Sequence, residues 1–160
     1  MTIKVGEKIP SVKLKYMTVD GPKDALSDEL FAGKKAVLFA LPGAFTPTCS
    51  AKHVPSFVNN FDALKAKGVE LIACLSVNDA FVMGAWSRDQ KAEDKVVMLA
   101  DGNADFTKAV GLDADYSAYG MGTRSQRYAM LLDNGVVKVL NVEKPGAFEV
   151  SNAETILAAL

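Results

Sequence analysis

Cys49 is the residue of this sequence whose type and position best suit covalent chemistry. It stands in the stretch LPGAFTPTCSAKHV, between an apolar run and a segment with apolar residues at helical spacing. Because Thr46 is a favourable helix N-cap and Pro47 suits the first helical position, Cys49 is expected at the third. There, unpaired backbone N–H groups and the positive end of the helix dipole favour the thiolate, the nucleophilic form of cysteine. The alternative interpretation is a small buried cysteine at a helix start.

Pro42 and Thr46 precede Cys49 in the spacing P-x-x-x-T-x-x-C. Pro42 can stiffen the chain after the strand and shield the thiol from water. The Thr46 hydroxyl can donate to an oxyanion and accept from a hydroxyl. A cation would complete such a site, because it holds the sulfur as thiolate and stabilises charge on a leaving oxygen. Arg124 and Arg127, in the segment GTRSQR, are the candidates for that cation.

A strand–helix–strand unit is expected to position these residues. Residues 36–41 (AVLFAL) and 69–77 (VELIACLSV) are apolar runs typical of strands buried on both faces. Between them, residues 50–68 carry apolar side chains at helical spacing and end at a glycine. Such a βαβ unit places its two strands parallel and adjacent.

The remaining elements predict a mixed sheet with helices on both faces. Residues 128–132 and 136–142, joined by Asp133-Asn134-Gly135, predict an antiparallel hairpin. Residues 112–127 are expected to be a long loop, and such loops often carry function. The other expected elements are strands at 12–16 and 95–100, a turn at 20–22, and helices at 27–31 (capped by Ser27), 79–91 (with Phe81 and Trp86 inward), 104–110 and 152–160 (capped by Ser151).

Length and composition limit the classes of function. A chain of 160 residues fits one α/β domain spanning residues 1–160. The net charge of −1 leaves no basic surface for nucleic acid, and no apolar run approaches the length of a membrane span. The first fifteen residues lack the apolar core of a signal peptide, and two cysteines suit a reducing compartment, so a cytoplasmic location is expected. No His, Cys or Asp cluster has metal-ligand spacing, so no metal or other cofactor is expected.

The segment PGAFTPTC resembles the active-site loop of the peroxiredoxins, and more narrowly that of the type-five subfamily, called type II in plants. The segments LKAKGVELIACLSVNDAFVMGAW, KVVMLADGNADF and RYAMLLDNGVVKVLNVE resemble the subfamily at the same offsets, so the resemblance covers nearly the whole chain. It implies a thioredoxin fold with the N-terminal additions of peroxiredoxins. It also implies thiol-dependent reduction of hydrogen peroxide and alkyl hydroperoxides.

The resemblance also assigns roles by position. Cys49 corresponds to the peroxidatic cysteine, Thr46 and Pro42 to pocket residues, and Arg124 to the invariant arginine of the family. In the implied mechanism, the Cys49 thiolate attacks the terminal peroxide oxygen and becomes a sulfenic acid. Thr46, Arg124 and backbone N–H groups would hold the two oxygens as their bond breaks.

His53 and Arg127 are candidates for residues that support this pocket from behind. His53 follows Cys49 by four residues and shares its helix face, so it either favours the thiolate or is a packed helix residue. Arg127 is either a supporting cation or a solvated strand residue. Cys74, inside the second apolar strand, is expected to be a small buried side chain.

The resemblance implies recycling by an external thiol. Members of the subfamily often carry a resolving cysteine in the loop before the last helix, whereas KPGAFEVSNAE has none here. One-cysteine recycling by glutathione and glutaredoxin is therefore expected, with thioredoxin as the other candidate reductant. The resemblance further implies a homodimer, for which the apolar Phe45, Phe81 and Tyr119 are interface candidates.

Two other functions compete with the peroxidase. The first is a peroxide sensor that passes its oxidation to a partner protein by disulfide exchange through Cys49. The second is a thioredoxin-like disulfide reductase. It is disfavoured because residues 49–52, CSAK, lack the second cysteine of a C-x-x-C motif.

Overall fold

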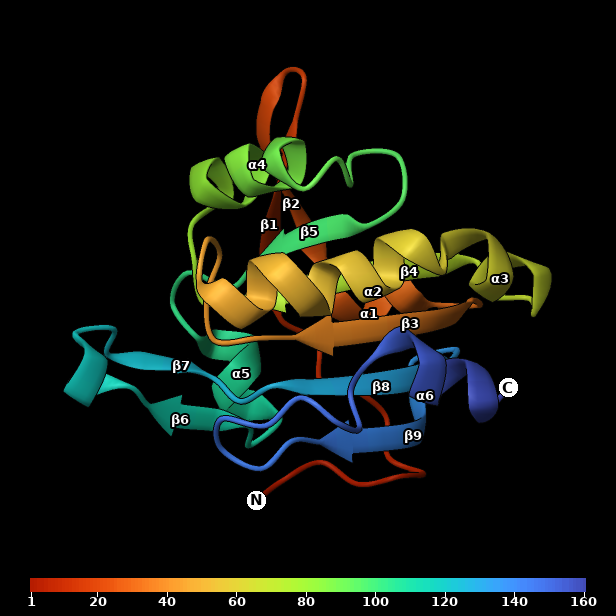
Figure 1. Cartoon of the computed structure of the whole chain (residues 1–160). Coiled ribbons are helices and arrows are strands. Elements are labelled where there is room, and N and C mark those ends of the chain that lie inside the picture. Colours follow the sequence, from red (N-terminus) through yellow and green to blue (C-terminus); the bar gives the residue numbers. More distant parts are fainter.

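Seven strands form one mixed sheet in the computed structural model, which describes residues 1–160 (Figure 1). Their order is β2-β1-β5-β4-β3-β8-β9. The strands of the sheet are β1 (Lys13–Thr18), β2 (Gly21–Leu26), β3 (Lys35–Ala40), β4 (Leu71–Ser76), β5 (Val97–Ala100), β8 (Tyr128–Asp133) and β9 (Val136–Val142). Strands β3, β4 and β5 run parallel, whereas β8 pairs antiparallel with both β3 and β9. The predicted βαβ unit and hairpin are confirmed.

Helices cover both faces of the sheet, because each buried strand sends alternate side chains to opposite sides. The helices are α1 (Ser27–Phe31), α2 (Val54–Asn59), α3 (Phe61–Ala66), α4 (Ala80–Asp89), α5 (Asp105–Ala109) and α6 (Ala153–Ala158). One core cluster joins Cys49 and Trp86 to residues of α2, α3 and α6, and the other lies under α1 and α5. This mixed sheet between two helical layers is the expected thioredoxin fold.

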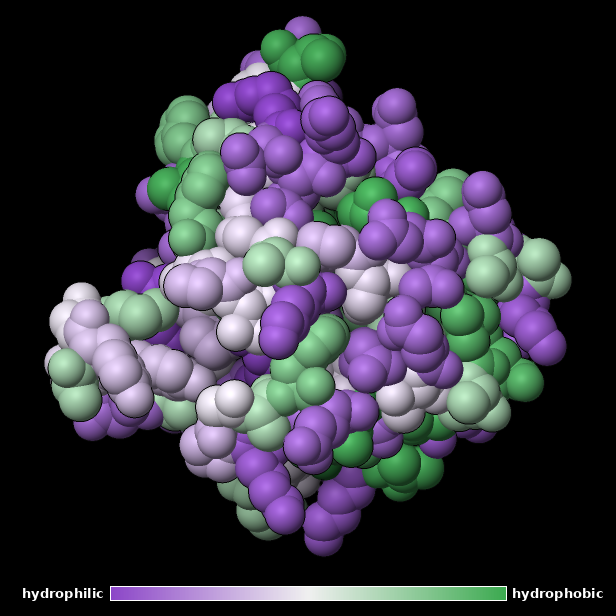
Figure 2. Space-filling view, viewed as in Figure 1, coloured by the Kyte–Doolittle hydropathy of each residue, from purple (hydrophilic) through white to green (hydrophobic).

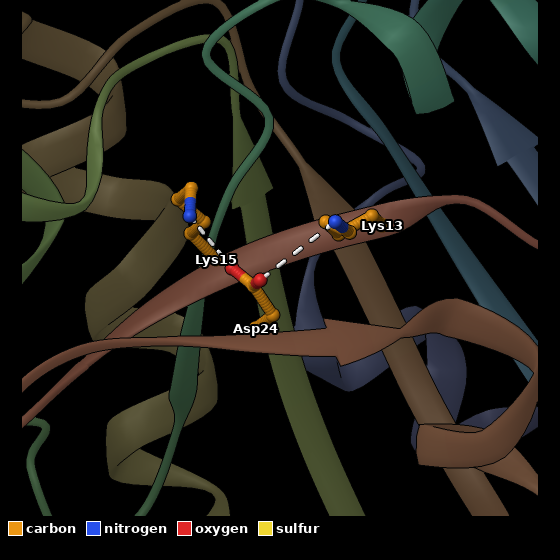
Figure 3. Close-up of polar contacts among 3 residues, drawn as sticks. All are labelled: Lys13, Lys15 and Asp24. Atoms are coloured by element: carbon orange, nitrogen blue, oxygen red, sulfur yellow. Dashed lines mark hydrogen bonds and ion pairs between the residues drawn. The ribbon is translucent and has the colours of Figure 1, made fainter.

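The hairpin β1–β2 contains a strand that the sequence did not predict. Gly21 and Pro22, expected in a turn, instead begin β2. Proline is tolerated there because β2 is an edge strand of the sheet. Two lysines of β1 form ion pairs with Asp24 of β2 (Figure 3). The Lys15 ammonium lies 2.6 Å from the Asp24 carboxylate, and the Lys13 ammonium lies 3.9 Å from the same carboxylate. The hydrogen bond from Lys15 lowers the pKa of Asp24.

Residues 112–127, expected to be a loop, form a two-stranded arm at the left of Figure 1. It consists of β6 (Asp113–Asp115), a 3₁₀ turn (Ser117–Tyr119) and β7 (Thr123–Ser125). Gly120 and Gly122 have φ of 71° and 66°, and glycine adopts such positive values without strain. Figure 2 shows the arm as mostly pale residues of intermediate hydropathy. The sequence did not predict the arm, because its strands have only three residues each and show no clear alternation of apolar and polar residues.

Three other expectations differ in detail. Ser27 is the first helical residue of α1 rather than its cap, and its hydroxyl donates to the Pro10 carbonyl. The cap of α6 is Asn152, whose side chain accepts from a backbone N–H, and not Ser151. Phe81 is 68% exposed and faces outward from α4, although Trp86 is buried as predicted. The Ser151 hydroxyl likewise has another partner, because it donates to Glu143.

Candidate active site

The turn that carries Cys49 follows β3 and starts a helix whose first full turn is a π-turn. Residues 47 and 48 are helical, so Cys49 occupies the predicted third position, and the π-turn spans Cys49–His53. The Val54 N–H donates to the Cys49 carbonyl, five residues back. Pro55 has no N–H to donate to residue 51, so the wider turn accommodates a bond that an α-helix would lose. The Cys49 side chain ends fully buried.

Thr46 stands directly before this helix but does not cap it. Its hydroxyl donates to the Gly43 carbonyl over 2.7 Å, and no side-chain bond caps the helix. Since the hydroxyl proton is used there, the oxygen lone pairs remain as acceptors. Of the two roles expected for the Thr46 hydroxyl, the donor is thus occupied by Gly43, and the acceptor remains available. Pro42 is buried at the end of β3, as expected of a shielding residue.

The guanidinium at the thiol belongs to Arg127 rather than to Arg124. Arg127 Nη2 donates to Cys49 Sγ over 3.3 Å. Arg127 directly precedes β8, whose first residue pairs with Ala40 at the end of β3. That pairing brings Arg127 to the point where the Cys49 turn begins. Of the two arginines that the sequence offered as this cation, Arg127 lies at the sulfur, whereas Arg124, which the resemblance assigned to the role, does not contact it.

Arg124 lies on β7 and fixes the arm instead. Its Nε donates to the Met121 carbonyl over 2.9 Å, and its Nη1 donates to the Pro42 carbonyl over 3.2 Å. A Cβ on Gly43 would lie 2.9 Å from Arg124 Nη1, so a side chain at this position would displace the guanidinium. Arg124 therefore connects the arm to the loop before Cys49.

His53 lies behind Arg127 and has no exposed surface. Its Nδ1 is 2.9 Å from Arg127 Nη1, and its Nε2 is 2.9 Å from the Ser151 carbonyl. A guanidinium only donates and a carbonyl only accepts, so the ring must carry its proton on Nε2 and accept at Nδ1. Burial, and next the charge of Arg127, lower the pKa of His53 to about 3. The ring is therefore neutral, and it contacts the arginine rather than the thiol.

A cleft of about 720 Å³ opens above the site, between the arm and the loop that follows β9. Its lining includes Pro42, Thr46 and Arg127, together with Tyr116 and Tyr119 of the arm. Cys49 does not line it, because the thiol is buried beneath these residues. The loop side of the cleft is formed by Glu143, Lys144, Pro145, Gly146 and Ala147.

Cys74 lies in β4 and is fully buried, as the sequence predicted. Burial raises the pKa of its thiol well above the ordinary value, which keeps it protonated and unreactive. Both cysteines are free. No three His, Cys, Asp or Glu side chains are grouped as metal ligands would be, and no helix is long and apolar enough to cross a membrane.

Glu143, Phe148 and Ser151 also belong to this neighbourhood, although sequence reasoning did not identify them. The centroid of the Phe148 ring lies 5.1 Å from the centroid of the His53 ring. It lies 5.9 Å from the guanidinium carbon of Arg127. Glu143 accepts hydrogen bonds from Ser151. In the sequence, the only indication was Glu143, an acidic residue directly after the hairpin.

Nearly the whole chain is similar to known proteins of one family. The sequence pattern of the Redoxin family matches residues 4–157. The chain is 52% identical to Peroxiredoxin-2E, chloroplastic, of Arabidopsis thaliana, over 99% of this chain and 70% of that protein. It is 48% identical to Peroxiredoxin-2C of Oryza sativa subsp. japonica, over 99% of this chain and 98% of that protein. It is also similar to the crystal structure of reduced Prx3 in complex with H₂O₂ from Vibrio vulnificus, with 59% identity, a TM-score of 0.95 and 99% of each chain covered.

The buried neutral His53 predicts a pH dependence of stability. The unfolded chain protonates this residue near pH 6.5, whereas the folded chain does so only near its pKa of about 3. Stability from the neutral ring is thus complete above pH 6.5 and is lost as the pH falls toward 3. Between pH 6.5 and 5, the free energy of unfolding should fall with a slope approaching about 1.4 kcal/mol per pH unit. Denaturant titration at several pH values measures this slope.

His53→Gln is the control, because His53 is the single histidine of the chain. The variant should lose most of the slope in this pH range. An equal slope in wild type and variant would show that another group is responsible.

Proposed function

Because the chain belongs to the peroxiredoxin family and is a thiol peroxidase, we propose that Cys49 is the thiol that peroxide oxidises. The observation that carries this proposal is the 3.3 Å hydrogen bond from Arg127 Nη2 to Cys49 Sγ at a helix start. The helix terminus supplies only about half a positive charge. The guanidinium adds a full one that persists at every physiological pH.

The proposed reaction is a two-electron transfer to the peroxide. The Cys49 thiolate attacks the terminal oxygen, an S–O bond forms and the O–O bond breaks. The terminal oxygen keeps its proton and stays on the sulfur, which is oxidised to sulfenic acid. The leaving oxygen takes from water the equivalent of the proton that the thiol released on ionisation, and departs as water or alcohol. Thr46 accepts from the protonated peroxide oxygen, and Arg127 donates to the sulfur and to the oxygen that gains charge. Pro42 shields the reacting atoms from water.

We propose an indirect part for Arg124. It donates to the Pro42 carbonyl and so fixes the backbone that leads to Thr46. Its guanidinium is also bound to the arm through the Met121 carbonyl. The charge beside the sulfur is therefore assigned to Arg127, and the shape of the pocket entrance to Arg124.

The two arginines should differ sharply when each is replaced. Arg127→Met removes a preorganised charged donor and should slow oxidation of Cys49 by hydrogen peroxide on the order of a hundredfold or more. Arg124→Met should slow it by a much smaller factor, because no donor at the sulfur is lost. Stopped-flow fluorescence measures the second-order rate, since the single tryptophan, Trp86, donates to the Ser50 hydroxyl beside Cys49. A larger loss in Arg124→Met than in Arg127→Met would return the cation role to Arg124.

For the second half of the cycle, we propose one-cysteine recycling by glutathione and glutaredoxin, with thioredoxin as the competing reductant. The loop at 143–151 has no cysteine, and Cys74 lies inside the core. The cleft is far larger than a peroxide and has room for part of a peptide thiol. Both reductants belong to a reducing compartment, so we keep the cytoplasm as the proposed location, which cell fractionation can test.

The recycling proposal predicts which cysteine carries glutathione. After one equivalent of peroxide and then glutathione, mass spectrometry should find one glutathionyl group, on Cys49 alone. Cys49→Ser should lose both the adduct and the peroxidase activity, and Cys74→Ser should retain most of the activity. A disulfide between Cys49 and Cys74 in the oxidised protein would contradict the proposal.

We also propose membership of the type-five, or plant type-II, subfamily, and a homodimer. The homodimer is supported by exposed aromatic side chains: Phe45, Phe81 and Tyr119 are 54%, 68% and 76% exposed. Phe45 also has a φ of 64°, which is unusual for a bulky residue and marks a constrained position. Its ring lies 6.4 Å from that of Trp86, so an interface here would adjoin the Cys49 turn.

Substitution of one of these exposed aromatic residues should dissociate the proposed dimer. Sedimentation velocity at micromolar concentration should give a dimer for the wild type and a monomer for Phe81→Glu, because a carboxylate would be buried at the interface. Val5→Glu is the matched control, since Val5 is 61% exposed in the N-terminal segment. A monomeric wild type would contradict the proposal.

A further inference from the structure

Glu143 is a nearly buried carboxylate held by backbone N–H groups. It is 7% exposed and lies just after β9. Its oxygens accept from the N–H groups of Glu149, Val150 and Ser151, at 2.8 to 3.0 Å, and from the Ser151 hydroxyl at 2.7 Å. Although burial disfavours its charge, these hydrogen bonds outweigh burial and lower the pKa of Glu143. The carboxylate thus closes the loop 143–151 on itself.

The loop 143–151 ends at Ser151, the residue that is hydrogen-bonded to His53. Ser151 gives Glu143 both its N–H and its hydroxyl, and its carbonyl accepts from His53 Nε2. The same loop presents Phe148, whose ring lies against His53 and Arg127. The hydrogen bonds therefore run without interruption from Glu143 to the arginine that contacts the sulfur.

We propose that Glu143 is a positioning residue for the peroxidase reaction, an inference that rests on the function proposed above. Its carboxylate fixes the Ser151 carbonyl, which holds the His53 ring. That ring in turn holds the Arg127 guanidinium against the Cys49 sulfur.

The hydrogen bonds of Arg127 and His53 indicate that each of these side chains depends on the next one for its position. Arg127 lines the open cleft and is only partly buried, so its side chain needs a fixed partner to stay at the sulfur. His53 can be that partner only while Nδ1 is free to accept, and the Ser151 carbonyl secures this by accepting a hydrogen bond from Nε2–H, which keeps the ring proton on Nε2. If the loop opened, the ring would lose the group that selects its tautomer. A misplacement of about 1 Å at a reacting group can cost a hundredfold in rate.

The test is the rate of Cys49 oxidation by hydrogen peroxide in Glu143→Ala. Loss of all the acceptor bonds should slow the reaction about tenfold, by analogy with the lower end of the loss when residues that orient metal ligands are replaced. Glu143→Gln should recover most of the rate, because its carbonyl oxygen can accept the same N–H groups. Glu149→Ala is the control, since the Glu149 side chain is exposed and only its backbone donates to Glu143.

A double-mutant cycle separates positioning from general destabilisation. In an Arg127→Met background, Glu143→Ala should have no further effect, because the group that it positions is gone. An equal loss in both backgrounds, or a rate within twofold of wild type in Glu143→Ala, would overturn the proposal. If Glu143→Ala does not fold, Ser151→Ala takes its place, with an expected loss of about threefold that also vanishes in Arg127→Met. An unchanged rate in Ser151→Ala would then overturn it.

These results are distinct from a failure of the proposed function. If peroxide does not oxidise Cys49 in the wild type, the proposed function fails. If it does so and every Glu143 variant matches the wild type, only the role of Glu143 fails.

Discussion

The contact between a guanidinium and a sulfur at the edge of a closed core is the interaction on which the rest of this structure depends. A thiolate is stable away from water only when a cation and hydrogen-bond donors replace its hydration. Cys49 is fully buried, so every such partner has to come from the protein. Arg127 supplies the charge because β8 pairs with β3 and starts beside the Cys49 turn. The antiparallel hairpin therefore has a chemical role as well as a structural one.

The directions of the hydrogen bonds around this contact are fixed by which groups can only donate and which can only accept. Arg127 only donates, so His53 must accept, and the ring proton must point to the Ser151 carbonyl. A protonated His53 would remove the acceptor and place two cations together. Burial of the ring prevents this by lowering its pKa, so a residue that appears suited to acid–base chemistry works here only as a neutral acceptor.

The fold and the candidate thiol could be predicted from the sequence, because long apolar runs and the P-x-x-x-T-x-x-C spacing are strong local signals. The choice between the arginines could not, since it depends on which residue begins a strand beside β3. One clue was available: alternate residues of a strand face one side. Ala129 and Leu131 lie in the same core cluster as Cys49. Arg127 is two residues before Ala129, so the same alternation directs it to the face of the sheet on which Cys49 lies.

Other differences arose where a side chain bonds to a partner outside its own helix or strand. Ser151 has the composition of a cap, but its hydroxyl bonds to Glu143, and Asn152 takes the capping position. The strands β2 and β6 are short or interrupted by Gly and Pro, so pairing rather than sequence pattern determines them. Neither kind of contact leaves a mark within a window of neighbouring residues.

Burial of Cys49 has opposite consequences for the two halves of the proposed cycle. A peroxide is small, and a dry site strengthens each interaction with the oxygen that gains charge. A peptide thiol is large and must bring its sulfur within bonding distance of a residue that the cleft does not reach. The turn must therefore open after oxidation, and the bonds that hold it closed oppose that step. The π-turn suits this requirement, because Pro55 has already removed one of the hydrogen bonds that would fix an α-helical turn. In the proposed cycle, the strength of the closed site is thus limited by the need to open it, and Cys49 lies at the irregular end of its helix, where fewer hydrogen bonds oppose that opening.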